Sequence, residues 1–204
     1  MTLRKQDYQS EKAVAGFLDK YFYPYYFERI SRLENIENQL KGIDIEGNYK
    51  GDILLIDEKT AAHYVNKNLP TFAFELDFIG KDGKVYQGWF YDDTKLTQYY
   101  LLTWIWAKRE KYFSTEDITK LEIILIKRSK IRKMLIEKGL TKNKAQHISS
   151  NLRLNQNYGV SGKQMGKPFY FYFTRHLSEK PINIIVYKRE LIKIGTLYKT
   201  IIPE

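Results

Sequence analysis

The stretch from residue 53 to residue 59 constrains the fold of this chain more than any other. The apolar run Ile53-Leu54-Leu55-Ile56 leads directly into Asp57-Glu58-Lys59. The run is apolar on both faces, which is typical of a central strand covered from both sides. Because side chains alternate along a strand, Asp57 and Lys59 point to one face and Glu58 to the other. Charges at the end of a buried strand are costly unless they have partners or a function. The sequence therefore predicts an interior strand that ends in a site.

A second short strand at residues 43–46 precedes this one. The turn between the two strands determines which residue lies opposite Asp44. A turn at Lys50-Gly51 brings Asp44 opposite Asp57, with the two carboxylates roughly 5 Å apart and Lys59 on the same face. Two acids at that distance repel each other unless a cation lies between them. Mg²⁺ suits such a pair, because it prefers one or two carboxylates plus waters and a substrate phosphate.

A competing turn gives a different result. Gly47-Asn48 is a favourable two-residue turn by composition. It would pair Asp44 with Gly51 and leave the two acids far apart. The metal site therefore depends on the register of this hairpin.

The spacing of these residues resembles a known motif. Asp44, followed thirteen residues later by Asp57-Glu58-Lys59, is similar to the bipartite motif of the PD-(D/E)xK nuclease superfamily, which includes restriction endonucleases and Holliday-junction resolvases. The resemblance implies that Asp44 and Asp57 bind Mg²⁺, with Mn²⁺ as a substitute, and that Lys59 positions or activates the attacking water. Ile43 stands where the motif has its proline.

Residues 10–22 have the apolar periodicity of an amphipathic helix, with Ser10 as a suitable N-cap. Glu11 lies near the expected start of this helix. It is either a favourable charge at a helix N-terminus or, by the resemblance, the first-helix glutamate that supports the metal site and joins the catalytic residues in many of these nucleases.

The order of expected elements also fits the resemblance. A strand at 25–35 and the two strands above follow the first helix, and an apolar helix at 95–108 with a strand at 121–127 completes an αβββαβ core. The expected class is α/β, with a mixed sheet flanked by helices as in restriction endonucleases. A hairpin of residues 72–79 and 85–91 is expected to extend this sheet, with Glu75 as a secondary metal or water contact.

Composition limits the functional classes. The 204 residues fit one domain. The absence of cysteine excludes disulfides and thiolate metal sites and fits a cytoplasmic protein. No apolar stretch is long enough to span a bilayer, so no membrane partner is expected. The net charge of +10 indicates a polyanionic partner, with nucleic acid the commonest; plain solubility is the alternative.

A basic segment follows residue 127, which divides a nuclease-like core at 1–127 from a C-terminal region at 128–204 packed on the same domain. Helices at 129–138 and 141–153, with caps at Ser129 and Thr141, precede a β-hairpin of residues 168–173 and 182–187. The helix pair is either a helix-turn-helix that enters a DNA groove or a solvated charged face. The residues expected to contact nucleic acid are Lys130, Arg132, Lys133, Lys142, Lys144, Arg153, Lys163 and Arg175.

The sequence thus predicts a Mg²⁺-dependent endodeoxyribonuclease that hydrolyses phosphodiester bonds in double-stranded DNA. The alternative is a non-catalytic DNA-binding protein, in which Asp57 and Lys59 form a structural ion pair. Homodimers are common among nucleases that cut both strands, so a homodimer is one expected state.

Overall fold

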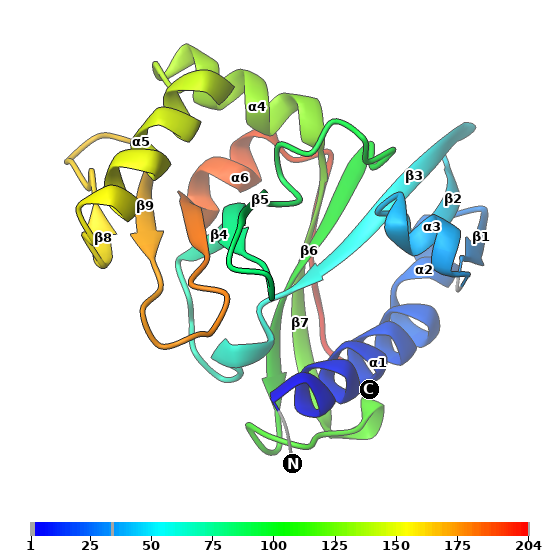
Figure 1. Ribbon diagram of the computed structural model, residues 1–204. Helices are drawn as coiled ribbons and strands as arrows, with labels where there is room; N and C mark the ends of the chain where they lie inside the picture. The colour runs from blue at the N-terminus through cyan, green and yellow to red at the C-terminus, as the bar shows by residue number, and fades with distance from the viewer. Residues whose placement is uncertain (1–2, 34, 204) are drawn as a thin grey trace. The chain divides into compact units, whose positions relative to one another are not determined.

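The computed structural model describes residues 3–33 and 35–203, with side chains from Tyr8 onward. The chain is α/β, as predicted, but it forms two sheets and two compact units (Figure 1). The first unit takes in residues 1–69, 96–128 and 195–204, and the second takes in residues 70–95 and 129–194. No helix within the described ranges is long and apolar enough to cross a membrane.

The first unit is built on a six-stranded mixed sheet with the order β1-β2-β3-β6-β7-β11. Strands β1, β2 and β3 form an antiparallel meander, and β6 lies parallel to β3. The bounds are β1 (Arg29–Arg32), β2 (Ile45–Tyr49), β3 (Asp52–Thr60), β6 (Tyr99–Ala107), β7 (Ile118–Lys127) and β11 (Leu197–Ile201). The chain therefore leaves the sheet after β3 and returns as its parallel neighbour, as a crossover connection requires.

The hairpin between β2 and β3 turns at Lys50-Gly51, which confirms that register and excludes the turn at Gly47-Asn48. Tyr49 pairs with Asp52, and both turn residues have positive φ, 54° for Lys50 and 84° for Gly51. Two consecutive residues of positive φ give the turn whose twist matches that of the flanking strands. Gly47 instead lies within β2, where an added Cβ would be 2.9 Å from the Phe27 ring. Close packing therefore accounts for that glycine.

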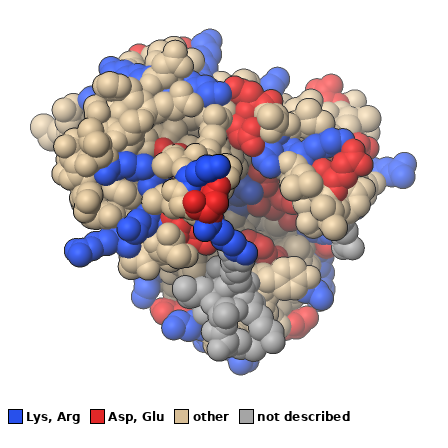
Figure 2. All heavy atoms as spheres, viewed as in Figure 1, with Lys and Arg blue, Asp and Glu red and all other residues tan. Residues whose placement is uncertain are grey.

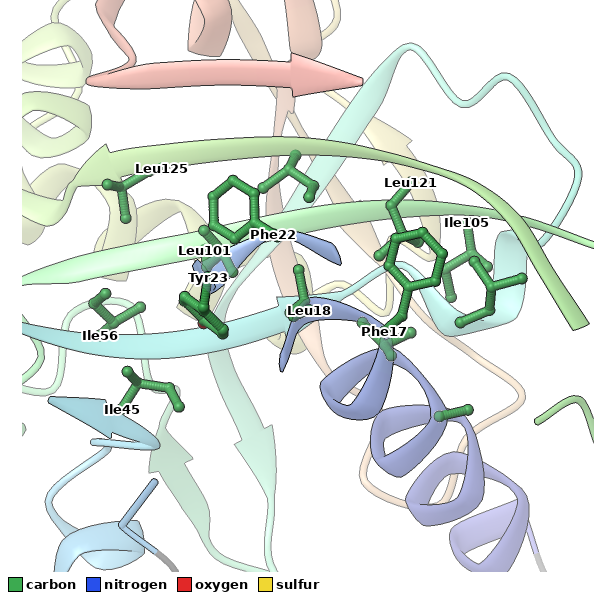
Figure 3. Packing of buried hydrophobic residues seen from close by; sticks show 14 of the residues in the cluster. Phe17, Leu18, Phe22, Tyr23, Ile45, Ile56, Leu101, Ile105, Leu121 and Leu125 are labelled. Atoms are coloured by element: carbon green, nitrogen blue, oxygen red, sulfur yellow. The ribbon is translucent and has the colours of Figure 1, made fainter. Parts of the chain in front are cut away.

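Helix α1 (Leu3–Tyr21) covers one face of this sheet. Its Phe17 and Leu18 are fully buried against Ile56 of β3 and against β6 and β7 (Figure 3). The predicted start at residue 10 is wrong, because the helix begins seven residues earlier; Ser10 is buried inside it and caps nothing.

Local chemistry also shortens the first strand. The predicted strand at 25–35 is reduced to β1, because Tyr23–Tyr26 form the short helix α2 with Pro24 in its first turn, where a missing N–H costs nothing. The segment between β1 and β2 contains helix α3 (Ile36–Leu40), and the side chain of Asn35 caps it by accepting from the N–H of Asn38.

The predicted helix at 95–108 is wrong, because this segment forms β6. The strand is buried along almost its whole length, between β3 and β7. A segment that is apolar on every side fits a buried helix or a central strand equally well. The tyrosines and tryptophans of this segment favour the central strand, because these residue types are enriched in strands.

The second unit contains the five-stranded sheet β5-β4-β10-β9-β8. All of its neighbouring strands are antiparallel. The strands are β4 (Thr71–Ile79), β5 (Val85–Gln87), β8 (Gly159–Ser161), β9 (Phe169–Phe173) and β10 (Ile182–Tyr187). The predicted hairpin of β9 and β10 is confirmed. The hairpin of β4 and β5 belongs to this sheet and does not extend the first one, which corrects that expectation.

Three helices lie between β7 and β11 in the chain: α4 (Arg128–Glu137), α5 (Lys142–Leu154) and α6 (Lys188–Ile194). The predicted helix pair is confirmed, and Thr141 caps α5 by accepting from the N–H of Lys144. Ser129 caps nothing, since α4 begins at Arg128. The compact units also differ from the expected division at residue 127, because residues 70–95 fold with the later segment and β11 returns to the first sheet beside β7.

Candidate carboxylate site

Asp44 and Asp57 meet in the first unit, where β2 begins and β3 nears its end. Ile45 pairs with Ile56, so Asp44 is the next residue outward and lies across from Asp57. The Asp44 N–H donates to the Ile56 carbonyl (2.9 Å), and the Asp44 Oδ2 atom accepts from the Glu58 N–H (2.8 Å). Asp44 is close enough to Asp57 for its charge to raise the pKa of Asp57. The hairpin register thus brings together the two halves of the motif.

The charge on Asp57 is unfavourable in this position. Its side chain is buried, with 4 % of the residue exposed. Burial raises the pKa of Asp57 from 3.8 to about 7, Asp44 adds to this effect, and Lys59 opposes it. A buried carboxyl next to a second carboxylate is stabilised by a proton or by a cation, and this pair therefore has the electrostatic character of a cation site.

Lys59 lies on the same face as Asp57, and its Nζ atom is 2.7 Å from Asp57 Oδ1. Burial by itself would lower the pKa of Lys59, but the charge and hydrogen bond of Asp57, with the charges of Asp44 and Glu11, raise it above its ordinary value. The ammonium therefore stays protonated across the neutral range, as a fixed positive charge beside the acid pair.

Glu11 is close enough to this group for its charge to act on Lys59. It lines the same cavity as Asp44 and Lys59. Because α1 begins at residue 3, Glu11 lies in the third turn of the helix, beyond the first turn in which the helix dipole acts. The interpretation of Glu11 as a helix-end charge is therefore wrong.

The opposite face of β3 carries a second set of polar contacts, which centres on Glu58. Tyr23 Oη donates to Glu58 Oε1 (2.5 Å), and Arg32 Nη1 donates to Glu58 Oε2 (2.9 Å). Arg32 also donates from Nε and Nη2 to the two Asp19 oxygens (2.7 and 2.8 Å), and from Nη2 to the Ala15 carbonyl (3.1 Å). All three guanidinium nitrogens therefore donate to the protein itself. We call Tyr23, Arg32, Asp19 and Glu58 the Glu58 network.

The Glu58 network fixes the strand that carries Asp57 and Lys59. Burial raises the pKa of Glu58, while Arg32 and the Tyr23 hydroxyl oppose the shift. Glu58 also donates its main-chain N–H to Asp44, and it directly follows Asp57 in the chain. The position of Glu58 therefore influences the positions of both Asp44 and Asp57. Sequence reasoning placed Glu58 on the face opposite Asp57 but assigned it no partner. The available signal was a carboxylate on a buried strand, which needs a donor.

The predicted nucleic-acid contacts all belong to the second unit, and several of them are held in ion pairs. Arg132 and Lys142 both contact Asp93 (2.8 and 2.5 Å), and together they lower its pKa to about 2, with Lys142 the larger influence. Arg153 pairs with the buried Asp77. These three cations are therefore committed to holding α4 and α5 in place.

The other five residues predicted to contact nucleic acid differ in exposure and in partners. Lys130 and Lys144 are exposed. Lys133 is 3.9 Å from Glu137, Lys163 lies over the Tyr170 ring, and Arg175 lies over Tyr158. Figure 2 shows a face on which Lys and Arg are interspersed with Asp and Glu.

Asp77 of β4 is buried between Arg153 and the Ser149 hydroxyl. Glu75, the secondary candidate, is on β4 in the second unit and outside the β1-β2-β3 meander.

The donor set of Asp44 and Asp57 fits a hard divalent cation. Both offer carboxylate oxygens, the ligand type that Mg²⁺ and Mn²⁺ prefer. Within the described part of the chain, no three Asp, Glu, His or Cys side chains are grouped to hold a metal. A pair of carboxylates, completed by water and phosphate oxygens, is a usual Mg²⁺ arrangement. Comparison of the chain with protein-family models, curated proteins and solved structures finds no match.

Proposed function

We propose that this protein is a Mg²⁺-dependent nuclease of the PD-(D/E)xK type that hydrolyses phosphodiester bonds in DNA. One observation carries the proposal: Asp44 and Asp57 face each other across the β2–β3 hairpin, with the Lys59 ammonium 2.7 Å from Asp57. The expected αβββ order and the parallel β6 beside β3 support it. The net charge of +10 suits a polyanionic substrate.

Each residue of the site has a distinct role in this proposal. Asp44 and Asp57 would hold the cation, which supplies charge neutralisation at the phosphate and a more acidic water when bound. Lys59, kept protonated by its acidic neighbours, stabilises the negative charge that develops on the scissile phosphate. A protonated lysine is a poor base, so its raised pKa favours this role over proton removal. Glu11 adds a further carboxylate beside Lys59 that is able to orient water.

Conversion of supercoiled plasmid to nicked and linear forms tests the proposal. The reactions contain Mg²⁺, Mn²⁺ or EDTA at low salt. Cutting is expected with either metal and not with EDTA, and Asp57→Asn and Lys59→Ala should each abolish it. Asp52→Asn, which changes an exposed acid on the same strand, should cut as the wild type does. A wild type that binds the plasmid but cuts neither the plasmid nor a single-stranded oligodeoxynucleotide would reject the nuclease and favour a binding protein.

A further inference from the structure

A cavity of about 560 Å³ opens beside the carboxylate site within the first unit. Its walls come from α1, from the ends of β1 and β3, from α3, and from Asp44 before β2. This volume lies within the usual range for small-molecule sites. Because Asp44 and Lys59 belong to the wall, a molecule in the cavity would be next to the group proposed to act on phosphate.

Several polar groups of the wall are already satisfied. Arg32 donates to Asp19, Glu58 and a main-chain carbonyl from all three of its nitrogens, so it is committed to the protein. Glu58 is committed to Arg32 and Tyr23. These residues form a rigid wall and have little capacity left to bind a ligand.

Three other groups of the wall are available: the Tyr8 ring, the Lys12 ammonium and the Gln39 amide. All three residues are exposed, Tyr8 to 68 %. None has a side-chain partner among the residues that the structure describes. An exposed aromatic ring in a cavity wall offers a stacking face, an ammonium binds phosphate, and an amide offers both a donor and an acceptor.

From this combination we infer that the cavity binds one unpaired nucleotide next to the scissile phosphate. Tyr8 stacks on the base, Lys12 contacts a backbone phosphate, and Gln39 hydrogen-bonds the edge of the base. A base inside a duplex is paired and stacked and does not reach such a wall. The substrate class is therefore DNA with single-stranded nucleotides at the cleavage point. The inference deepens the proposed nuclease function and rests on it for the identity of the neighbouring phosphate.

Binding of a short, fluorescently labelled oligodeoxythymidylate tests the inference separately from cleavage. Fluorescence anisotropy is measured at low salt with EDTA, for the single strand and for its duplex with oligodeoxyadenylate. Tyr8→Ala should weaken single-strand binding by about 10-fold, since stacking on an aromatic ring is lost, and leave duplex binding unchanged. Tyr8→Phe keeps the ring and should bind as the wild type does. Lys12→Ala should weaken single-strand binding and reduce its dependence on salt by about one phosphate contact.

Tyr25→Ala is the matched control, because Tyr25 is an equally exposed tyrosine of the first unit that does not line the cavity. Single-strand binding that is equal for wild type and Tyr8→Ala would overturn the inference, as would an equal loss in Tyr25→Ala or in Tyr8→Phe. A Tyr8-dependent binding site in a protein that cuts no DNA would support the cavity and reject the nuclease, so the two failures are distinguishable.

Discussion

At the scale of single residues, Asp57 holds a charge that the fold disfavours. Its burial and its acidic neighbour raise its pKa to about 7, so the ionised side chain costs free energy even with the Lys59 ammonium 2.7 Å away. Functional sites often keep such groups at the expense of stability. In this protein the cost and the proposed metal site arise from the same two carboxylates.

Asp57→Asn is therefore expected to stabilise the metal-free protein. At pH 8 in EDTA, the free energy of unfolding should increase by about 1–2 kcal/mol, less than the raised pKa alone implies, because Lys59 loses its ion pair with Asp57. Added Mg²⁺ should raise the Tm of the wild type and leave the variant unchanged, since binding to the folded state alone stabilises it. Asp52→Asn is the control on the same strand. A lower Tm for Asp57→Asn in EDTA would contradict the argument.

The same carboxyl predicts a pH dependence. In the unfolded chain it loses its proton near its ordinary pKa of 3.8, and in the folded protein near pH 7. Between these values the folded state holds the extra proton, so wild-type stability falls as pH rises through the window. The Tm advantage of Asp57→Asn should therefore grow from about pH 4 to about pH 7 and level off above it. Thermal unfolding across this range in EDTA measures the difference, and a constant difference would exclude the raised pKa.

At the scale of elements, the β2–β3 turn sets the register that brings the acids together. Gly51 has a φ of 84° with nothing within 4 Å of an added Cβ. Gly51→Ala should therefore cost about 1–2 kcal/mol for backbone conformation alone. Lys50→Asn, which places a residue tolerant of positive φ in the turn, should be neutral or stabilising. Urea unfolding of both variants checks this pair of expectations, and equal stability of Gly51→Ala and wild type would contradict the turn.

The Glu58 network gives a second prediction at this scale. Arg32→Gln leaves the partly buried Glu58 carboxylate without its cation and should cost about 3 kcal/mol. The double variant Arg32→Gln, Glu58→Gln also removes the unpaired carboxylate charge. Its loss of unfolding free energy should therefore be smaller than the sum of the losses in the two single variants. Arg29→Gln changes an exposed arginine of the same strand and serves as the control. Additive losses in urea unfolding would show that the two side chains are not coupled.

Sequence patterns predicted those elements whose chemistry is local. The Lys50-Gly51 turn, the strand at 121–127 and the Thr141 cap each depend on a few neighbouring residues, and each is confirmed. The facing of Asp44 and Asp57 followed from that turn. The prediction of a helix at 95–108 was wrong because burial on every side removes the periodicity of apolar residues that distinguishes a helix from a strand. The Glu58 network could not be predicted, because it joins residues far apart in the sequence, such as Asp19 and Glu58.

At the scale of the whole molecule, the chain has a net charge of +10. Its basic side chains fall into two kinds: those that stabilise the fold through ion pairs and those that are exposed to a partner. Arg132, Lys142 and Arg153 are of the first kind, because each pairs with a carboxylate in the second unit. Lys130 and Lys144 are exposed and are the best candidates of the second kind. The two kinds should respond differently to substitution.

Neutralising Lys130 and Lys144 together should weaken DNA binding without loss of stability. If both contact phosphates, the slope of log affinity against log salt should become shallower by about 2, since each contact releases roughly one counterion. Lys108→Ala with Lys111→Ala removes the same charge from exposed positions of the first unit, and it separates a local contact from a long-range effect of net charge. Equal changes of slope in the two double variants would assign the binding to net charge alone. Arg153→Ala should instead lower the Tm, because the buried Asp77 then keeps its charge without its cation.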